Sequence, residues 1–178
     1  ASASASASTP SPALSSFFSR FDNSWTEQLT PNLEVNDPSA DNKMRPVRHG
    51  HYVAVDPRPL TEPRLLLHSP EMVAALGISE EEVGSPAFLR FFSGDVRAAG
   101  SPGRIAAWAT PYALSIMGTP YTSNCPFGTG EGYGDGRASS VGEVVTDGAR
   151  TELQLKGSGP TPFCRGADGR AVLRSSIR

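Results

Sequence analysis

The spacing of apolar residues predicts short helices through the first two thirds of the chain. Between residues 17 and 29, phenylalanine, tryptophan and leucine recur at helical spacing, which indicates a short amphipathic element. Ser69, Pro70 and Glu71 form a typical helix start, because serine caps a helix, proline fits its first position and an acid stabilises its first turn. The helices that we predict farther along span residues 70–76, 87–92 and 105–117, and residues 79–82 are expected to begin another short helix.

The last third of the chain alternates apolar and polar residues, which is the pattern of strands. Leu153 and Leu155 alternate with polar neighbours, so we predict a strand over residues 151–155 and a second one over residues 141–145. Other strands are expected at residues 47–55 and at the leucine run 65–67, which we interpret as buried, and loops at residues 30–46 and 95–104. We interpret this mixture of helices and strands as an α+β fold.

The composition fits one small lobe preceded by a tail. Residues 1–16 are Ala-Ser repeats and prolines without charge, which bury too little surface to offset chain entropy, so we expect disorder. We divide the remainder into a helical and extended region, residues 17–118, and a strand-rich part, residues 119–178. The formal net charge of −2 gives no basic surface for nucleic acid, and no apolar run approaches the ~18 residues of a membrane span.

Histidines and cysteines do not point to a metal or redox site. His49 and His51 lie two positions apart, but no cysteine or carboxylate stands at ligand spacing, so we interpret them as side chains of a strand. Cys125 and Cys164 are too few for a disulfide framework, and we interpret them as free or buried thiols.

A glycine-rich turn followed by two strands is the strongest candidate for binding chemistry. In Gly134-Asp135-Gly136-Arg137, the glycines permit positive φ and let backbone N–H groups approach a ligand, a geometry that suits phosphate. Arg137 adds a planar cation that can bind phosphate oxygens through two hydrogen bonds. Lys156 ends the second strand, and protein kinases use the same order of glycine loop, strands and lysine at their ATP site. Taken singly, the turn could close a hairpin and Lys156 could be a solvated strand end.

Three short motifs in residues 134–178 match the pattern of one known family. They are Gly-Asp-Gly-Arg at 134–137, Glu-Leu-Gln-Leu-Lys-Gly at 152–157 and Asp-Gly-Arg-Ala-Val-Leu-Arg-Ser-Ser-Ile-Arg at 168–178. In these motifs the chain resembles the selenoprotein O family of pseudokinase-like protein adenylyltransferases. The resemblance implies a kinase-like N-terminal lobe that holds ATP inverted and transfers AMP, rather than phosphate, to Ser, Thr or Tyr hydroxyls of proteins. The residues that it places at the ATP site are Gly134, Gly136, Arg137, Lys156, Asp168 and Gly169.

The chain also departs from the pattern of this family. Before the glycine turn the family usually carries Gly-His-Gln-Phe-Gly, a tryptophan and Gln-Leu, whereas residues 121–133 keep only Phe127-Gly128, which indicates a divergent branch. Phe163-Cys164 replaces the usual Tyr-Ser. In the family, the glutamate partner of the lysine, the catalytic aspartate and the Mg²⁺ ligands lie downstream of the position of Arg178. We therefore expect the catalytic and metal residues, and the C-terminal lobe, outside this chain.

These observations predict that the complete protein is a protein adenylyltransferase that uses ATP and Mg²⁺. The chain would be its N-terminal part, inactive alone, with protein substrates as partners and neither nucleic acid nor a membrane span. The serine-rich start and the resemblance favour a mitochondrial location over a plastid. The alternative hypothesis is a catalytically inactive scaffold or interaction subunit of an organelle assembly. An ordinary kinase that transfers phosphate ranks third.

Overall fold

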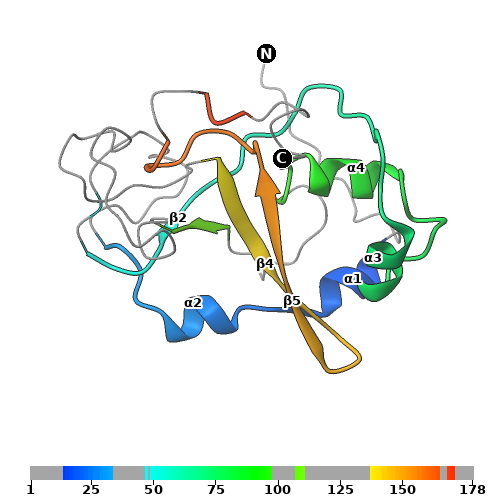
Figure 1. Ribbon diagram of the computed structural model, residues 1–178, viewed down its shortest axis with the longest axis horizontal. Coiled ribbons are helices and arrows are strands. Elements are labelled where there is room, and N and C mark those ends of the chain that lie inside the picture. The colour runs from blue at the N-terminus through cyan, green and yellow to red at the C-terminus, as the bar shows by residue number, and fades with distance from the viewer. Residues whose placement is uncertain are drawn as a thin grey trace, which may run out of the picture.

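The computed structural model describes residues 14–33, 47, 49–97, 107–110, 137–164 and 168–170. Within these residues, one antiparallel sheet of five strands is accompanied by four short helices, so the α+β prediction is confirmed (Figure 1). A long hairpin crosses the middle of the molecule in this view, and three of the helices lie together on one side of it. No helix in the described part of the chain has the length and apolar character needed to cross a membrane.

The two longest strands form this hairpin: β4, Ala138–Thr146, and β5, Ala149–Lys156. They pair antiparallel along most of their length. Asp147 and Gly148 connect them with φ of 50° and 80°, and two successive positive values match the twist of the flanking strands. Both strands predicted in this region are confirmed, with longer bounds, because the alternation of apolar and polar residues is a local signal.

The other edge of β4 pairs with two short strands in succession. β1, Phe21–Asp22, pairs with the second half of β4, and β3, Trp108–Ala109, pairs with its first half. β2, Val53–Ala54, pairs with β3 and completes the sheet among the described residues. The strand predicted at residues 47–55 is therefore confirmed only at its end.

A bulge in β4 separates the two pairings on this edge. The register shifts between Ser140 and Glu143, where Gly142 has φ of 116°. A Cβ at Gly142 would lie 2.8 Å from the ring of Phe21. The bulge therefore requires glycine, which lets the aromatic side chain of β1 pack directly on the β4 backbone.

The amphipathic element of residues 17–29 consists of two helices with β1 between them. α1 is Ser15–Ser19 and α2 is Ser24–Gln28. Its apolar residues do not share one face, because pairing with β4 places Phe21 in the sheet, whereas Trp25 on α2 is 44% exposed. Leu14 is fully buried, so residues 14–16, which we assigned to the disordered tail, belong to the fold; residues 1–13 lie outside the described ranges.

Two further helices begin at serine-proline pairs. α3 is Pro70–Ala75 and α4 is Pro86–Phe92. The hydroxyl oxygens of Ser69 and Ser85 each accept a backbone N–H of the following first turn at 3.2 Å. These contacts satisfy donors that a helix start leaves without a partner. The helices predicted at residues 70–76 and 87–92 are confirmed.

Two predictions near these helices are wrong, one for the segment before α3 and one for the segment between α3 and α4. Residues 65–67 form no strand, and Leu66 and Leu67 are 77% and 70% exposed, because the segment runs along the surface without a strand partner among the described residues. Residues 79–82 form a single turn rather than a helix, in which the Glu82 N–H donates to the Ser79 carbonyl at 3.0 Å. The Glu82 carboxylate also accepts the N–H of Ser79, at 3.0 Å, and this local contact stabilises the turn without a following helix.

The helix predicted over residues 105–117 is wrong where the structure describes it. Trp108 and Ala109 form strand β3, which is hydrogen-bonded on both sides, to β2 and to β4. Sheet pairing decides this conformation, although tryptophan and alanine also fit the helical spacing of the sequence. Residues 105, 106 and 111–117 lie outside the described ranges.

An aromatic cluster forms the centre of the core. Phe17, Phe18, Phe21 and Phe91 are almost fully buried, and the ring of Phe17 meets the ring of Phe21 edge to face with centroids 5.1 Å apart. This cluster joins α1, β1 and α4, and fully buried valines of β4 belong to the same core. The core therefore holds the hairpin in place.

Candidate functional site

The open end of the β4–β5 hairpin brings two predicted site residues together. Lys156 is the last residue of β5 and lies opposite Ala138, the first residue of β4. The N–H of Gly157 donates to the carbonyl of Arg137 at 2.6 Å, so the pairing continues one residue beyond both strands. Arg137 and Lys156 are therefore held on adjacent strands at one end of the sheet, although 19 positions separate them in the sequence.

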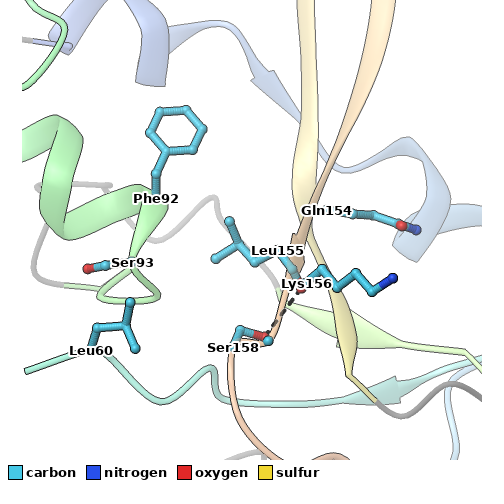
Figure 2. Close-up of a pocket in the computed structure, with 8 residues that line it drawn as sticks. Leu60, Phe92, Ser93, Gln154, Leu155, Lys156 and Ser158 are labelled. Atoms are coloured by element: carbon cyan, nitrogen blue, oxygen red, sulfur yellow. Dashed lines mark hydrogen bonds between the residues drawn. The ribbon is translucent and has the colours of Figure 1, made fainter. Parts of the chain in front are cut away.

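The alternation along β5 directs the Lys156 side chain outward. Leu153 is buried and Leu155 half-buried, while the residues between and after them are exposed. Figure 2 shows Lys156 and Gln154 on one face of the strand and Leu155 on the other, directed towards Leu60. The ammonium group of Lys156 therefore points to the surface and not into the core.

A small pocket lies beside the end of β5, on the side of Leu155. Its volume is about 130 Å³, below the ~300 Å³ at which small-molecule sites begin, so it does not hold a nucleotide by itself. Hydrogen bonds of Ser158 Oγ to Leu155 O at 3.5 Å and to Ser139 Oγ at 3.2 Å fix one wall. The lining residues are Leu60, Phe92, Ser93, Gln154, Leu155, Lys156, Gly157 and Ser158 (Figure 2).

The predicted Asp168-Gly169 turn is present and packs against the chain that follows β5. The Asp168 carboxylate accepts the N–H of Arg170 at 2.9 Å, which closes the turn. Gly169 has φ of 73°, and a Cβ there would lie 2.1 Å from the carbonyl carbon and oxygen of Gly159. Only glycine allows this approach, so the sequence Asp-Gly sets the contact between the turn and residues 159–160.

Arg170 joins the turn to the end of β5, a role that the sequence analysis did not assign to it. Its Nη1 donates to the carbonyl of Arg58 at 2.8 Å and to that of Gly157 at 3.2 Å, and its Nη2 donates to the carbonyl of Pro59 at 3.3 Å. The Arg58 partner lies 112 positions away, and no local pattern in the sequence indicates it. The signal that was present is an arginine directly after a turn, which we took only as part of a motif.

The site as described is cationic at the hairpin end. Arg137 and Lys156 are placed there by strand pairing, and Asp168 and Gly169 are brought to the same region through Gly157 and Arg170. Two cations on adjacent strands at the end of a rigid hairpin can each balance the charge of phosphate groups. Gly134 and Gly136, the predicted glycines of the turn before β4, lie outside the described residues.

The family of this chain is shown by its similarity to known proteins. The family model of the protein adenylyltransferase SelO matches residues 37–178. This chain belongs to the SelO family. The SelO match contains all six residues that we predicted at the nucleotide site, including the two glycines outside the described ranges.

Three bacterial relatives of the SelO chain are named protein nucleotidyltransferase YdiU. The protein of Xanthomonas axonopodis is 44% identical over 161 residues, which cover 89% of this chain and 27% of the relative. The protein of Azoarcus sp. (strain BH72) is 42% identical over 160 residues, with the same coverage. That of Aromatoleum aromaticum is 45% identical over 148 residues, 80% of this chain and 26% of the relative. The chain thus spans about a quarter of the length of these relatives.

A second polar cluster of the SelO chain lies farther along the hairpin, away from Lys156. The Glu143 side chain is 2% exposed and accepts hydrogen bonds from Ser24, from the Trp25 backbone and from Arg150. Arg150 also donates to Asp22 at 2.7 Å, and this hydrogen bond is the main reason that the pKa of Asp22 lies below its usual value. The cluster ties α2 to the sheet, and its partners account for all of its polar groups named here, so we assign it a structural role.

The structure also describes two residues that the sequence offered as possible metal or redox groups, His51 and Cys164. The Nδ1 of His51 accepts the Thr30 N–H at 3.0 Å, which gives this histidine a structural partner. Cys164 is buried, as expected, and forms no disulfide among the described residues, and Cys125 lies outside the described ranges. Within the described ranges, no three His, Cys, Asp or Glu side chains gather closely enough to hold a metal ion.

Proposed function

We propose that this chain supplies the nucleotide-binding part of a protein adenylyltransferase, which transfers AMP from ATP to Ser, Thr or Tyr hydroxyls of proteins. The observation that carries the proposal is the placement of Arg137 and Lys156 on adjacent strand ends, with the Asp168-Gly169 turn joined to the chain directly after Lys156. The family match and the name of the relatives, protein nucleotidyltransferase, support nucleotide chemistry.

The proposed reaction exchanges one phosphorus–oxygen bond for another and releases one proton. The hydroxyl oxygen of the substrate protein attacks the α-phosphorus of ATP, the bond between that phosphorus and pyrophosphate breaks, and the hydroxyl proton passes through a base to solvent as pyrophosphate leaves. Arg137 and Lys156 would balance charge on the phosphates, and the glycines at 134 and 136 would let the loop close over them. Asp168 and Gly169 would shape the pocket. The sheet with its strand lysine would form a lobe like the N-terminal lobe of protein kinases.

The described residues do not fit a complete magnesium site. Asp168 carries the one carboxylate among the six residues predicted at the nucleotide site, and it already accepts the Arg170 N–H. The described ranges hold no cluster of three potential ligands. From the family pattern given above, we propose that the Mg²⁺ ligands and the catalytic residues follow the position of Arg178 in the complete protein. The mitochondrial location, with the plastid as alternative, stays a prediction.

The test uses the complete protein with Lys156→Ala and, as a matched control, Gln154→Ala on the same exposed face of β5. Both are incubated with a protein substrate and ATP labelled either at the α- or at the γ-phosphate. We expect label from the α-phosphate only, a loss of at least ~100-fold for Lys156→Ala, and little change for Gln154→Ala. Transfer of the γ-phosphate would instead indicate a kinase. Absence of any transfer and of ATP binding would favour the scaffold hypothesis.

A further inference from the structure

Arg170 connects two segments of the chain that border the proposed nucleotide site. Its guanidinium donates to carbonyls of Arg58 and Pro59 in the segment after β2 and to the carbonyl of Gly157, directly after Lys156. The distances are 2.8, 3.3 and 3.2 Å. A single side chain thus bridges positions that are more than 90 residues apart in the sequence.

Other contacts of the backbone reinforce this bridge. The Arg58 N–H donates to the Ser158 carbonyl at 2.7 Å, so the segment after β2 is also bonded directly to the loop after β5. In the turn that precedes Arg170, Gly169 lies against Gly159 so closely that no Cβ fits at Gly169. The Arg170 backbone closes the Asp168 turn. Three segments therefore meet at the end of β5, and the Arg170 guanidinium is bonded to two of them while its backbone belongs to the third.

We propose that Arg170 is a positioning residue that fixes the distance between the Lys156 end of β5 and the Asp168-Gly169 turn. This inference rests on the proposed function, because those two elements are the parts of the site that it would align. The Arg170 guanidinium binds backbone carbonyls, whereas Arg137 and Lys156 are the cations that would contact phosphate in the proposed function. An arginine in a nucleotide motif is readily taken for a phosphate ligand, and the contacts of Arg170 assign it a different role.

The chemistry of the guanidinium explains why arginine occupies this position. Its N–H groups lie in one rigid plane and point in different directions, so one side chain can donate to three carbonyls from two segments. A lysine ammonium keeps the charge, but it is a point donor without this fixed fork. Arg170→Lys therefore separates the geometry of the contact from its charge.

The first arm of the test measures hydrogen exchange of the complete protein without nucleotide. We expect Arg170→Ala to accelerate exchange at Arg58 and at residues 157–159 by about tenfold, while exchange in α4 stays unchanged. Arg64→Ala is the matched control, because it removes an exposed arginine from the segment that leads to α3. Unchanged exchange at the bridged residues in Arg170→Ala overturns the proposal.

The second arm measures kcat for AMP transfer and Kd for ATP. A positioning role predicts that kcat falls by about 10- to 100-fold while Kd for ATP changes by less than about threefold, because misalignment affects the reacting geometry more than the binding. Arg170→Lys is expected to resemble Arg170→Ala. Full rescue by lysine, or a Kd for ATP that rises more than tenfold with unchanged exchange, overturns the proposal and indicates a phosphate contact.

The two arms also separate this inference from the proposed function. If the wild-type complete protein neither binds ATP nor transfers AMP, the proposed function fails and the positioning role fails with it. If the wild type transfers AMP and Lys156→Ala does not, while Arg170→Ala keeps wild-type exchange and kcat, only the positioning role fails.

Discussion

Replacement of Glu143 by alanine tests the contact that holds α2 to the sheet. Its buried carboxylate accepts the hydroxyl of Ser24 at 2.9 Å, the Trp25 N–H at 2.9 Å and Arg150 Nη1 at 3.2 Å. Asn23, the residue before α2, makes no side-chain cap. Glu143 therefore serves as the cap of this helix, although it belongs to β4 and lies 118 positions from Trp25 in the sequence.

The expected loss follows from the donors that alanine leaves without a partner. A fully buried donor that loses its acceptor costs about 1–3 kcal/mol, and the two donors at the start of α2, Ser24 and Trp25, are only partly buried, so each falls at the lower end of this range. Arg150 adds little, because its side chain is 42% exposed and regains water. We expect Glu143→Ala to lower the free energy of unfolding by about 2 kcal/mol, a sizeable share of the ~5–15 kcal/mol of a typical domain.

Urea unfolding of the chain, followed by tryptophan fluorescence, measures this loss. Trp25 is a suitable reporter because it lies on α2 with its ring centroid 6.1 Å from that of Trp108. Glu152→Ala is the matched control, since Glu152 is the exposed partner of Glu143 across the hairpin and its loss should stay within about 0.5 kcal/mol. Equal losses in the two variants would refute the argument that the buried hydrogen bonds stabilise α2.

Two further predictions concern the effect of low pH on stability and the replacement of glycines by alanine. The pKa of Glu82 lies below its usual value, mainly because its carboxylate accepts the Ser79 N–H and, after that, the Leu14 N–H. The ionised carboxylate therefore stabilises the folded chain above about pH 4, and this stabilisation is lost as the pH falls through the lowered pKa of the folded state. The urea midpoint should therefore fall on acidification from pH 7 to 3, and by less in Glu82→Gln; an identical fall in the two proteins would contradict this. Gly169→Ala should destabilise the chain more than Gly148→Ala in the same assay. Both glycines have positive φ, so either alanine strains the backbone, and for Gly148, with no atom within 4 Å of an added Cβ, this strain alone lowers the free energy of unfolding by ~1–2 kcal/mol. At Gly169 the added Cβ would also lie 2.1 Å from backbone atoms. Equal losses would show that the turn moves away from Gly159 without cost.

The parts of the fold that the sequence predicts well depend on neighbours in sequence. The strands β4 and β5 follow from the alternation of apolar and polar residues, and α3 follows from its serine cap and proline. Where the sequence analysis failed, partners distant in sequence decide the structure. Trp108 joins a strand because β2 and β4 flank it, whereas the leucines at 65–67 find no strand to pair with among the described residues.

The same distinction applies to the candidate site. Lys156 and Asp168 could be selected as nucleotide residues because they stand in short motifs, and the hairpin explains how Lys156 comes beside Arg137. Arg170 stands in the same motif, but its contacts with Arg58 and Pro59 are visible only in three dimensions. A motif therefore identifies residues without assigning their roles. Strand pairing leaves Lys156 on an exposed face, where a phosphate can reach it. The three carbonyl contacts of Arg170 instead direct its charge into the fold. Substituting lysine for Arg170 separates these two uses of a cation, since it keeps the charge and removes the geometry.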